Sequence, residues 1–395
     1  MSRSTHNTVP IPALVLTFAA AFLAGGLVQT AVAQAQPAQS PTDAPVAFAY
    51  VSSNPSGNTH QINAYTAASN GELTAVPGSP FPANVSEMAV NGKYLFGTDG
   101  VSIYSFSIAA NGALTQVASI NVQQIDDGCG SASALFLDHT GTTLYDWDYD
   151  GNDCANNAYQ SFSINQSTGQ LTYLGGDSVG SEYFQGGMSF IGDNEYAYGS
   201  SCYQFTPDLY GFQRESSGLL NYLNINPSLP NAPQGSFYCP TLSSADPNSN
   251  VAIAMVPLND ESWQPTGPYQ FAVYTADSSG NLTTNSTYSN MPATAVQTVL
   301  DYWMSPAGNL LAVAGTGGAQ VFHFNGSNPI THYTGLLTHQ EIDQLLWDNV
   351  NHLYGIGRKA NSLFVGTITP TRVSEAPGSP YTITNPVNII VLPKN

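Results

Sequence analysis

The chain has 395 residues, and its 26 Asp and Glu outnumber its seven Lys and Arg to give a formal net charge of −19. Nucleic acid is therefore a poor partner, because neutralising phosphates requires clustered Lys and Arg that this sequence lacks. Charged residues make up only 8% of the chain, so the surface is expected to be uncharged and polar.

The first 33 residues have the pattern of an export signal. Residues 1–10 carry Arg3 and no acid, residues 11–28 form an apolar run, and Ala31 to Ala33 are the small residues that a signal peptidase requires. The alternative is an uncleaved membrane anchor, although this run is at the short limit for a span of about 20 residues. The sequence thus predicts a signal peptide over residues 1–33 and an extracytoplasmic protein, periplasmic or secreted, with no membrane span after cleavage. The remainder carries six Lys and Arg against 26 Asp and Glu, a formal charge of −20.

Residues 34–45 have the composition of a disordered linker, and residues 46–395 are expected to form one domain. In this domain an aromatic-rich apolar run, a polar turn ending in Gly and a short apolar run recur about every fifty residues. The seven copies begin at Ile62, Ile103, Tyr159, Leu209, Phe271, Val321 and, with the Gly lost, Leu363. Ahead of each stands a second pair of short runs joined by an Asp, Asn or Gly turn, as in Met88 to Phe96. Each unit is therefore predicted to be a four-stranded antiparallel meander.

Seven meanders predict an all-β fold, a seven-bladed β-propeller of four-stranded antiparallel blades. Radial packing buries both faces of each meander and leaves only short edges. A solenoid would need shorter units, and a helical array would need a 3.6-residue period that is absent after the N-terminus. The first unit begins at Ala47 to Val51 with no strand ahead of it, and Val387 to Leu392 follows the last unit. We therefore expect the C-terminal strand to pair into blade 1 and to close the ring.

Four Cys in an exported chain predict two disulfides. All four are expected in loops on one face of the propeller. We favour the pairs Cys129–Cys154 and Cys202–Cys239, although the sequence leaves the connectivity open.

A run of acids in the third unit resembles a calcium loop, in which oxygen ligands stand at every second residue. The candidate ligands for Ca²⁺, the one cofactor that the sequence suggests, are Asp146, Asp148, Asp150 and Asp153. The bidentate Glu that ends such loops is missing. The alternative is that Asp146 and Asp148 continue a strand, with their side chains at a solvated edge, and that the rest is a polar loop.

A second candidate site follows from the propeller plan. The loops that enter the innermost strands and those joining second to third strands surround the central channel on one face, where ligands bind. The polar residues expected there are Asp126, Asp127, Glu182, Asp301, His339, Glu341, Asp343, His60, Arg358 and Lys359.

The catalytic candidates in this set are His339, Asp343, Arg358, Glu182, Asp127 and Asp301. A carboxylate beside an imidazole supports acid/base chemistry, and Arg358 suits a ligand carboxylate. The alternative is that acids gather there because the protein is acidic and loops are polar. Trp303 and Trp347, on innermost strands, are expected to be core residues.

The repeats resemble those of the lactonase-like seven-bladed propeller family, which includes bacterial 6-phosphogluconolactonase and is related to YVTN-repeat surface proteins. The resemblance lies in the phrase aromatic-x-turn-Gly-x-Leu-Thr-x-Val-x-Gly-Ser-Pro, complete at Tyr65 to Pro80, and in the inner turn Asn91 to Leu95. It covers residues 46–392 and implies hydrolysis of a sugar lactone at the channel mouth.

This chain departs from that expectation, because a phosphorylated lactone calls for several Lys or Arg and the predicted mouth offers Arg358 and Lys359 among many acids. Two hypotheses remain. In the first, which we favour, the protein is an exported monomeric binding module that engages a carbohydrate, a peptide or an envelope protein through loops such as Asp260 to Pro268 and Tyr203 to Asp208. In the second it is a lactonase-type hydrolase. A fold alone does not decide between them.

Overall fold

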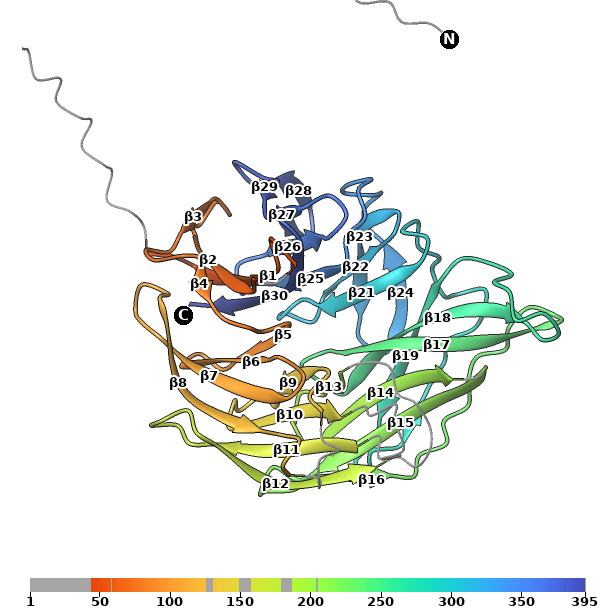
Figure 1. The fold of residues 1–395 in the computed structure, drawn as a ribbon. Coiled ribbons are helices and arrows are strands. Elements are labelled where there is room, and N and C mark those ends of the chain that lie inside the picture. The colour runs from red at the N-terminus through yellow and green to blue at the C-terminus, as the bar shows by residue number, and fades with distance from the viewer. Residues whose placement is uncertain are drawn as a thin grey trace, which may run out of the picture. The chain divides into compact units, whose positions relative to one another are not determined.

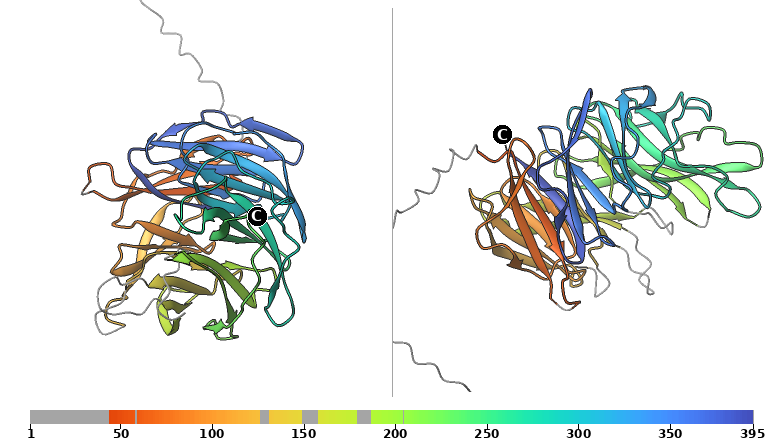
Figure 2. Two further views of the ribbon diagram at one scale, coloured as in Figure 1. Left: turned by 90° about the vertical axis from the view of Figure 1, so that its right-hand side faces the viewer. Right: turned by 90° about the horizontal axis from the view of Figure 1, so that it is seen from above.

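The structure is a computed structural model that describes residues 44–57, 59–125, 131–148, 158–178, 187–203 and 205–394. Within these ranges the chain contains strands and turns but no helix, and the strands form seven antiparallel sheets arranged around a central axis (Figures 1 and 2). The predicted seven-bladed propeller is confirmed.

Each blade has its innermost strand on the central channel, and its other strands follow in order outward. Blade 1 contains β30 (Pro386–Pro393), β1 (Ala47–Ser53), β2 (Gln61–Ala67) and β3 (Leu73–Ala75), with β4 (Phe81–Pro82) beside β2. Blade 2 contains β5 (Glu87–Val90), β6 (Tyr94–Thr98), β7 (Ser102–Ile108) and β8 (Leu114–Asn121). Blade 3 contains β9 (Leu135–Leu137), β10 (Thr143–Asp148), β11 (Ala158–Ile164) and β12 (Leu171–Ser178).

The remaining four blades have the same plan. Blade 4 contains β13 (Ser189–Phe190), β14 (Tyr196–Tyr203), β15 (Thr206–Arg214) and β16 (Leu220–Leu223), and blade 5 contains β17 (Ser236–Ala245), β18 (Asn250–Asn259), β19 (Gln270–Ala276) and β20 (Leu282–Thr283). Blade 6 contains β21 (Val299–Met304), β22 (Leu310–Gly315), β23 (Gly318–Asn325) and β24 (Asn328–His332). Blade 7 contains β25 (Gln344–Trp347), β26 (His352–Gly357), β27 (Ser362–Thr369) and β28 (Arg372–Glu375), with β29 (Tyr381–Thr382) beside β27.

The ring closes as predicted, because β30 pairs antiparallel with β1 as the innermost strand of blade 1. Ala49 stands opposite Val391 in this register, and every residue of β1 is buried. The two ends of the domain therefore complete one sheet.

The Gly that ends each repeat's polar turn joins one blade to the next. Gly112 and Gly280 have φ values of 87° and 80°, a region that L side chains rarely adopt. A Cβ atom at Gly112 would lie 2.8 Å from the Phe48 ring of blade 1, and one at Gly280 would lie 2.7 Å from the Tyr196 ring of blade 4. The repeated Gly is thus required because its turn packs directly on the preceding blade.

Tyrosines on the second strands strengthen these joints. The Tyr50 hydroxyl donates to the Gly112 carbonyl at 3.0 Å, Tyr145 donates to Gly218 at 2.7 Å, and Tyr198 donates to Gly280 at 2.8 Å. Each bond is buried and links neighbouring blades. Burial raises the pKa of Tyr145 to about 12 and that of Tyr50 and Tyr198 further, so these hydroxyls stay protonated and keep donating.

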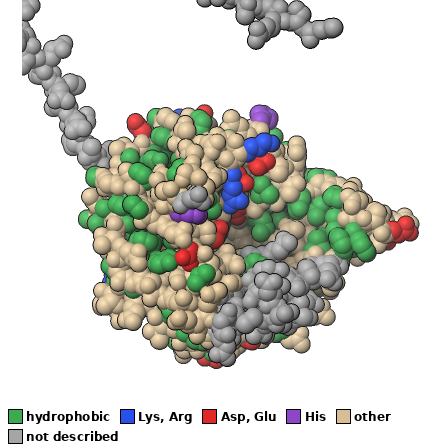
Figure 3. Space-filling view, in the orientation of Figure 1, with side chains coloured by type: hydrophobic (Ala, Val, Ile, Leu, Met, Phe, Trp, Pro, Cys, Tyr) green, Lys and Arg blue, Asp and Glu red, His purple; other side chains and the backbone are tan. Residues whose placement is uncertain are grey.

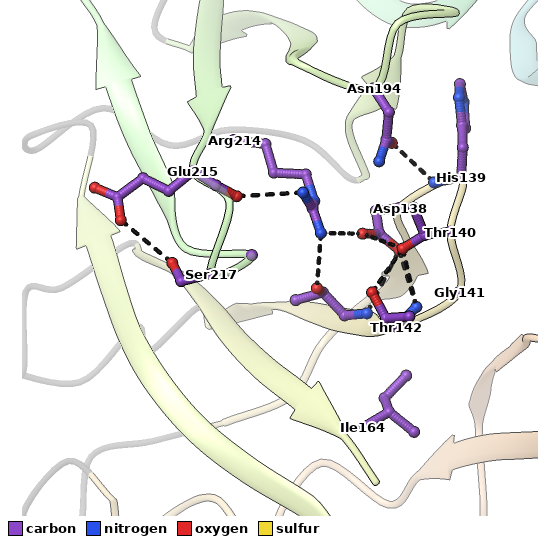
Figure 4. Close-up of polar contacts among 12 residues, drawn as sticks. Asp138, His139, Thr140, Gly141, Thr142, Ile164, Asn194, Arg214, Glu215 and Ser217 are labelled. Carbon is purple, nitrogen blue, oxygen red and sulfur yellow. Dashed lines mark hydrogen bonds and ion pairs between the residues drawn. The ribbon is translucent and has the colours of Figure 1, made fainter. Parts of the chain in front are cut away.

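Blades 3 and 4 are also joined by an ion pair. Arg214, at the end of β15, reaches Asp138 in the turn before β10, with 2.6 Å between Nη2 and Oδ2 (Figure 4). The same guanidinium donates to Thr143 Oγ1 at 3.3 Å and to the Glu215 carbonyl at 3.2 Å. Asp138 has no exposed side-chain surface, so removal of Arg214 would leave a buried charge unpaired.

One predicted disulfide, Cys202–Cys239, is present and links blade 4 to blade 5 across 37 residues of sequence. Its cysteines lie in β14 and β17, whereas the sequence placed them in loops. The prediction of loops was wrong because both strands are longer than the repeat pattern indicates. The other predicted pair, Cys129–Cys154, lies outside the described residues.

Candidate ligand site in the central channel

The innermost strands of all seven blades line a cavity of about 490 Å³ on the propeller axis. Most of its wall is apolar, as befits short core strands. Five polar or aromatic side chains, Glu87, Asp301, Trp303, Gln344 and Asn388, come to it from strands β5, β21, β25 and β30. On the face seen in Figure 3, acidic, basic and histidine side chains gather beside a hollow.

Alternation along β21 places Asp301 and Trp303 on the channel side and Tyr302 in the core between blades. Trp303 is 41% exposed, although the sequence predicted a core residue. The other predicted core tryptophan, Trp347, is buried, and its Nε1 donates to the Trp303 carbonyl at 2.9 Å. The prediction for Trp303 was wrong because an innermost strand has one face on the channel as well as one in the core.

Two amides accompany the carboxylates. Asn388 is buried on β30, and its Nδ2 donates to Glu87 Oε2 at 2.6 Å. Asn388 Oδ1 is buried without a hydrogen-bond partner among the described residues, an arrangement that suits a donor on a bound molecule. Gln344 is held through Oε1, which accepts from the Ile389 N–H at 3.2 Å.

Burial raises the pKa of both channel carboxyls. The pKa of Glu87 rises from 4.5 to about 7, and the positive charge of Arg358 opposes part of this rise. The pKa of Asp301 rises from 3.8 to about 7 through burial, against hydrogen bonds from the Leu345 and Tyr302 N–H groups at 2.9 Å and from the Trp303 side chain. The charge of Glu87 adds the smallest contribution to the rise at Asp301.

Arg358 and Asp343 lie together at the blade 7 side of the mouth. Arg358 Nη1 is 3.9 Å from Asp343 Oδ1, and the Arg358 N–H donates to Asp343 Oδ2 at 2.7 Å. The guanidinium also donates to the Val387 carbonyl, through Nη2 at 2.7 Å and through Nε at 3.2 Å. The Arg358 side chain is 46% exposed.

The predicted catalytic residues converge only in part. Asp301 lies in the cavity, and Asp343 and Arg358 form a pair at its mouth. His339 is exposed, and among the described residues no hydrogen bond or ion pair links it to Asp301 or Arg358. Asp127 and Glu182 lie outside the described residues, so their placement stays a prediction.

The remaining predicted mouth residues fall into two groups. Lys359 and Glu341 are at the surface of blade 7, exposed and half-buried respectively, and His60 is half-buried with Nε2 3.3 Å from Asn54 Nδ2. Asp126 lies outside the described residues.

The calcium prediction is not tested. Asp150 and Asp153 lie outside the described residues, and of Asp148 only its place at the end of β10 is described. Asp146 is fully buried in β10, not at a solvated edge as the alternative had it. The described part of the chain contains no group of three or more His, Cys, Asp or Glu placed to hold a metal ion.

Sequence reasoning missed Glu87, Trp303, Gln344 and Asn388. The signal that could have found Glu87 is an acid at the start of an apolar four-residue strand, Glu87 to Val90, which stands at the same place in blade 2 as Asp301 in blade 6. Asn388 could have been found in the same way as the lone polar residue of the closing strand.

Fold and channel together define a seven-bladed propeller whose axis holds a cavity with a few polar side chains in its wall. Among solved structures, the chain is similar to PpgL, the periplasmic gluconolactonase of Pseudomonas aeruginosa, with a TM-score of 0.62 and 13% identity over 88% of this chain and 99% of that one. Two structures described as candidate 6-phosphogluconolactonases are similar as well. The one from Bacteroides uniformis has a TM-score of 0.61 and 12% identity over 88% of this chain and 99% of its own, and the one from Bacteroides fragilis has 0.58 and 16% over 89% and 99%.

No family model and no curated protein sequence matches the chain. At the identities above, the structural likeness shows a shared fold and nothing finer. At that level the expected resemblance to lactonase-like propellers is confirmed. Within the described residues no helix is long and apolar enough to cross a membrane.

Proposed function

We propose that the protein binds an uncharged, polyhydroxylated small molecule of the sugar or sugar-lactone class at the mouth of the central channel. The observation that carries this proposal is the partly exposed indole of Trp303 beside Asp301 in a cavity of about 490 Å³. An aromatic face covers the apolar side of a sugar ring, while carboxyl and amide groups exchange hydrogen bonds with its hydroxyls. Glu87, Gln344 and Asn388 provide those groups here.

Charge limits the ligand class. The described lining residues of the cavity include the carboxyls of Glu87, Asp246 and Asp301 but no Lys or Arg, and Arg358 at the mouth is already paired with Asp343. A phosphate or another multiply charged anion would be repelled. The proposed ligand is therefore unphosphorylated.

Lactone hydrolysis is the second candidate, and the two channel carboxyls with raised pKa values, Glu87 and Asp301, support it. With both pKa values near 7, one carboxyl can be ionised and the other protonated at neutral pH. The carboxylate would take a proton from water as the water oxygen attacks the lactone carbonyl, and the acid would protonate the departing ring oxygen. The shared fold with a periplasmic gluconolactonase points to the same reaction.

One titration tests both candidates. D-glucose and D-glucono-1,5-lactone are added separately, with tryptophan fluorescence and calorimetry as readouts and a pH-stat to follow acid release from the lactone. We expect saturable binding that Trp303→Ala weakens at least tenfold, while Tyr288→Ala, which removes a 53% exposed ring elsewhere, changes nothing. Binding of neither probe, or equal loss in both variants, would refute a sugar site.

The hydrolysis outcome is read separately. Acid release faster than the uncatalysed rate, abolished by Glu87→Gln and by Asp301→Asn, would establish a hydrolase. Binding without acid release would leave the protein as a binding module.

We also propose that the protein is exported. The Cys202–Cys239 disulfide supports an oxidising compartment, and a periplasmic protein shares the fold. Cell fractionation with N-terminal sequencing tests this: a mature chain beginning just after Ala33 is expected, and an intact N-terminus in the cytosolic fraction would refute it.

A further inference from the structure

Blade 5 carries a projection that the channel site does not use. Its two inner strands, β17 and β18, have ten residues each, whereas β5 and β6 of blade 2 have four and five. The extra length lies at the start of β17 and the end of β18, on the face where the innermost strands begin, and it forms the tip at the right of Figures 1 and 3. The Cys202–Cys239 disulfide ties this extension to blade 4.

Two aromatic rings meet on this extension. Phe205, between β14 and β15, stacks on Trp263, between β18 and β19, with ring centroids 4.4 Å apart and planes 14° apart. The two residues are 40% and 49% exposed. Both have positive φ, 64° and 56°, which is uncommon and costly for residues other than Gly. Two loops from different blades thus hold two stacked aromatic rings together at the surface, in place of a single exposed side chain.

The loop that carries Trp263 is held in shape by Asn259. Asn259 Oδ1 accepts from the N–H groups of Glu261 and Ser262 at 3.0 and 2.8 Å, and the Trp263 N–H donates to the Asn259 carbonyl at 2.9 Å. A ring presented by a fixed loop loses little conformational entropy when a partner binds.

Acids flank the rings, and basic residues are far away. Asp260 and Glu261 stand shortly before Trp263 in the same loop and are exposed, and Figure 3 shows acidic beside hydrophobic side chains at the tip. Between residues 94 and 357 the sequence has a single Lys or Arg, Arg214. Arg214 is paired with Asp138 in the turns of the opposite face. The acids at the tip therefore have no Lys or Arg of their own region to pair with, and the chain as a whole is strongly acidic.

We propose that Phe205, Trp263, Asp260 and Glu261 form an aromatic–acidic platform that docks a Lys- or Arg-bearing segment of another protein. A cation over an aromatic face gains about 0.5–1 kcal/mol at an exposed site, and the two carboxylates add attraction that also speeds encounter. A neutral oligosaccharide could use the rings and donate hydrogen bonds to the carboxylates, but it would gain nothing from their negative charge, so the charge pattern favours the cationic segment.

Binding of octa-arginine and octa-lysine peptides to the full chain, measured by calorimetry and Trp fluorescence at low and physiological salt, tests the platform. We expect saturable binding that weakens with salt. Trp263→Ala should lower the affinity about fivefold, which corresponds to the loss of about 1 kcal/mol. Asp260→Asn with Glu261→Gln should lower both the affinity and its salt dependence.

Matched controls distinguish binding at the platform from attraction by the net negative charge of the whole protein. Glu72→Gln with Glu375→Gln makes the same change in net charge at two exposed acids of blades 1 and 7, and Tyr288→Ala removes an exposed ring elsewhere. Both should keep wild-type affinity, as should Trp303→Ala, because the platform does not depend on the channel. Unchanged thermal midpoints would show that each variant folds.

Three outcomes would overturn the proposal. These are no binding at low salt, equal loss in the control and platform variants, and binding of cellohexaose, in place of the peptides, that depends on Trp263. The last result would reassign the rings to a neutral sugar.

Discussion

Two carboxyls on the propeller axis determine the acid/base properties of the channel. Glu87 and Asp301 come from blades 2 and 6, yet both line the same cavity, and burial raises the pKa of each to about 7. Such pairs, poised near neutral pH, occur at functional sites more often than at structural ones. The pair is therefore the first place to probe by mutation.

The raised pKa of Glu87 makes a prediction about stability. Between about pH 4.5 and 7 the folded protein holds a proton on Glu87 that the unfolded chain releases, so this group's contribution to stability is full below about pH 4.5 and is lost as the pH rises through 7. In Glu87→Gln the stability relative to wild type should thus increase between about pH 5 and pH 8, by on the order of 1–3 kcal/mol.

Urea unfolding of both proteins at these two pH values measures the change. Glu72→Gln, at an exposed acid, serves as the control and should show no such trend. A difference between Glu87→Gln and wild type that does not vary with pH would contradict the assignment.

The candidate site shows which of its residues could be predicted from the sequence and which could not. Asp301 was predicted because an acid in an entry loop stands out, and Arg358 and Asp343 were predicted for the same reason. Trp303 was assigned to the core, since sequence pattern does not tell a strand face on the channel from one between blades. Asn388 was missed because its role depends on strand β30 meeting Glu87, 301 residues away.

At the scale of the element, the repeated turn is the unit that builds the ring. The sequence showed the Gly of that turn but not its purpose, because the partner lies in another repeat. In the structure each such Gly touches the second strand of the preceding blade, through Phe48 for Gly112 and through Tyr196 for Gly280. The local sequence pattern therefore predicted the strands and turns, but it did not predict the contacts between blades.

Gly112→Ala tests this role. A methyl group there meets the Phe48 ring at 2.8 Å and forces an unfavourable φ, so we expect a loss of about 2–4 kcal/mol in unfolding free energy. Gly92→Ala is the matched control, because Gly92 also has positive φ, 92°, but open space around its Cβ position. It should lose only the backbone cost of about 1–2 kcal/mol. If the two variants lost equal unfolding free energy in urea, the close contact between the blades would add nothing to the cost of the substitution.

The outer edges of the blades are protected by hydroxyl groups. Ser79 and Ser379, in the two Gly-Ser-Pro phrases, accept the N–H groups of Ala64 and Val365 at 2.9 Å. Ser286 and Thr334 accept from Val273 and Val321 at 2.8 and 2.9 Å. These bonds satisfy third-strand N–H groups beyond the short outer strands, which limits pairing between molecules.

At the scale of the whole molecule, the ring depends on its closing strand. A chain that ends at Asn385 lacks β30 and leaves β1 without its inner partner. We expect this chain to lose its single cooperative unfolding transition and to bind a hydrophobic dye, because every residue of β1 is otherwise buried.

A chain that ends at Pro393 keeps β30 and is the control. Of the contacts made by described residues, it loses the bond from the Lys394 N–H to the Val46 carbonyl and the Lys394 contact with the Phe48 ring. A synthetic peptide of residues 386–395 should restore the transition of the shorter chain. A shorter chain that unfolds cooperatively without the peptide would show that closure is dispensable.

The number of blades and the mode of closure could both be predicted from the sequence, because the count of repeats and the unmatched strand at each end are properties of a linear pattern. The lengths of β17 and β18 and the stacking of Phe205 on Trp263 could not, since strand length departs from the repeat pattern there and the two rings come from different repeats.

The pairing of β1 with β30 also bears on how the protein is made. Ser52 and Asn388, joined by a hydrogen bond in that pair, are 336 residues apart, so the ribosome releases β1 long before it completes the partner strand. Until then the nascent chain carries a hydrophobic strand edge open to aggregation. We therefore expect a chaperone to hold the nascent chain until its last residues arrive.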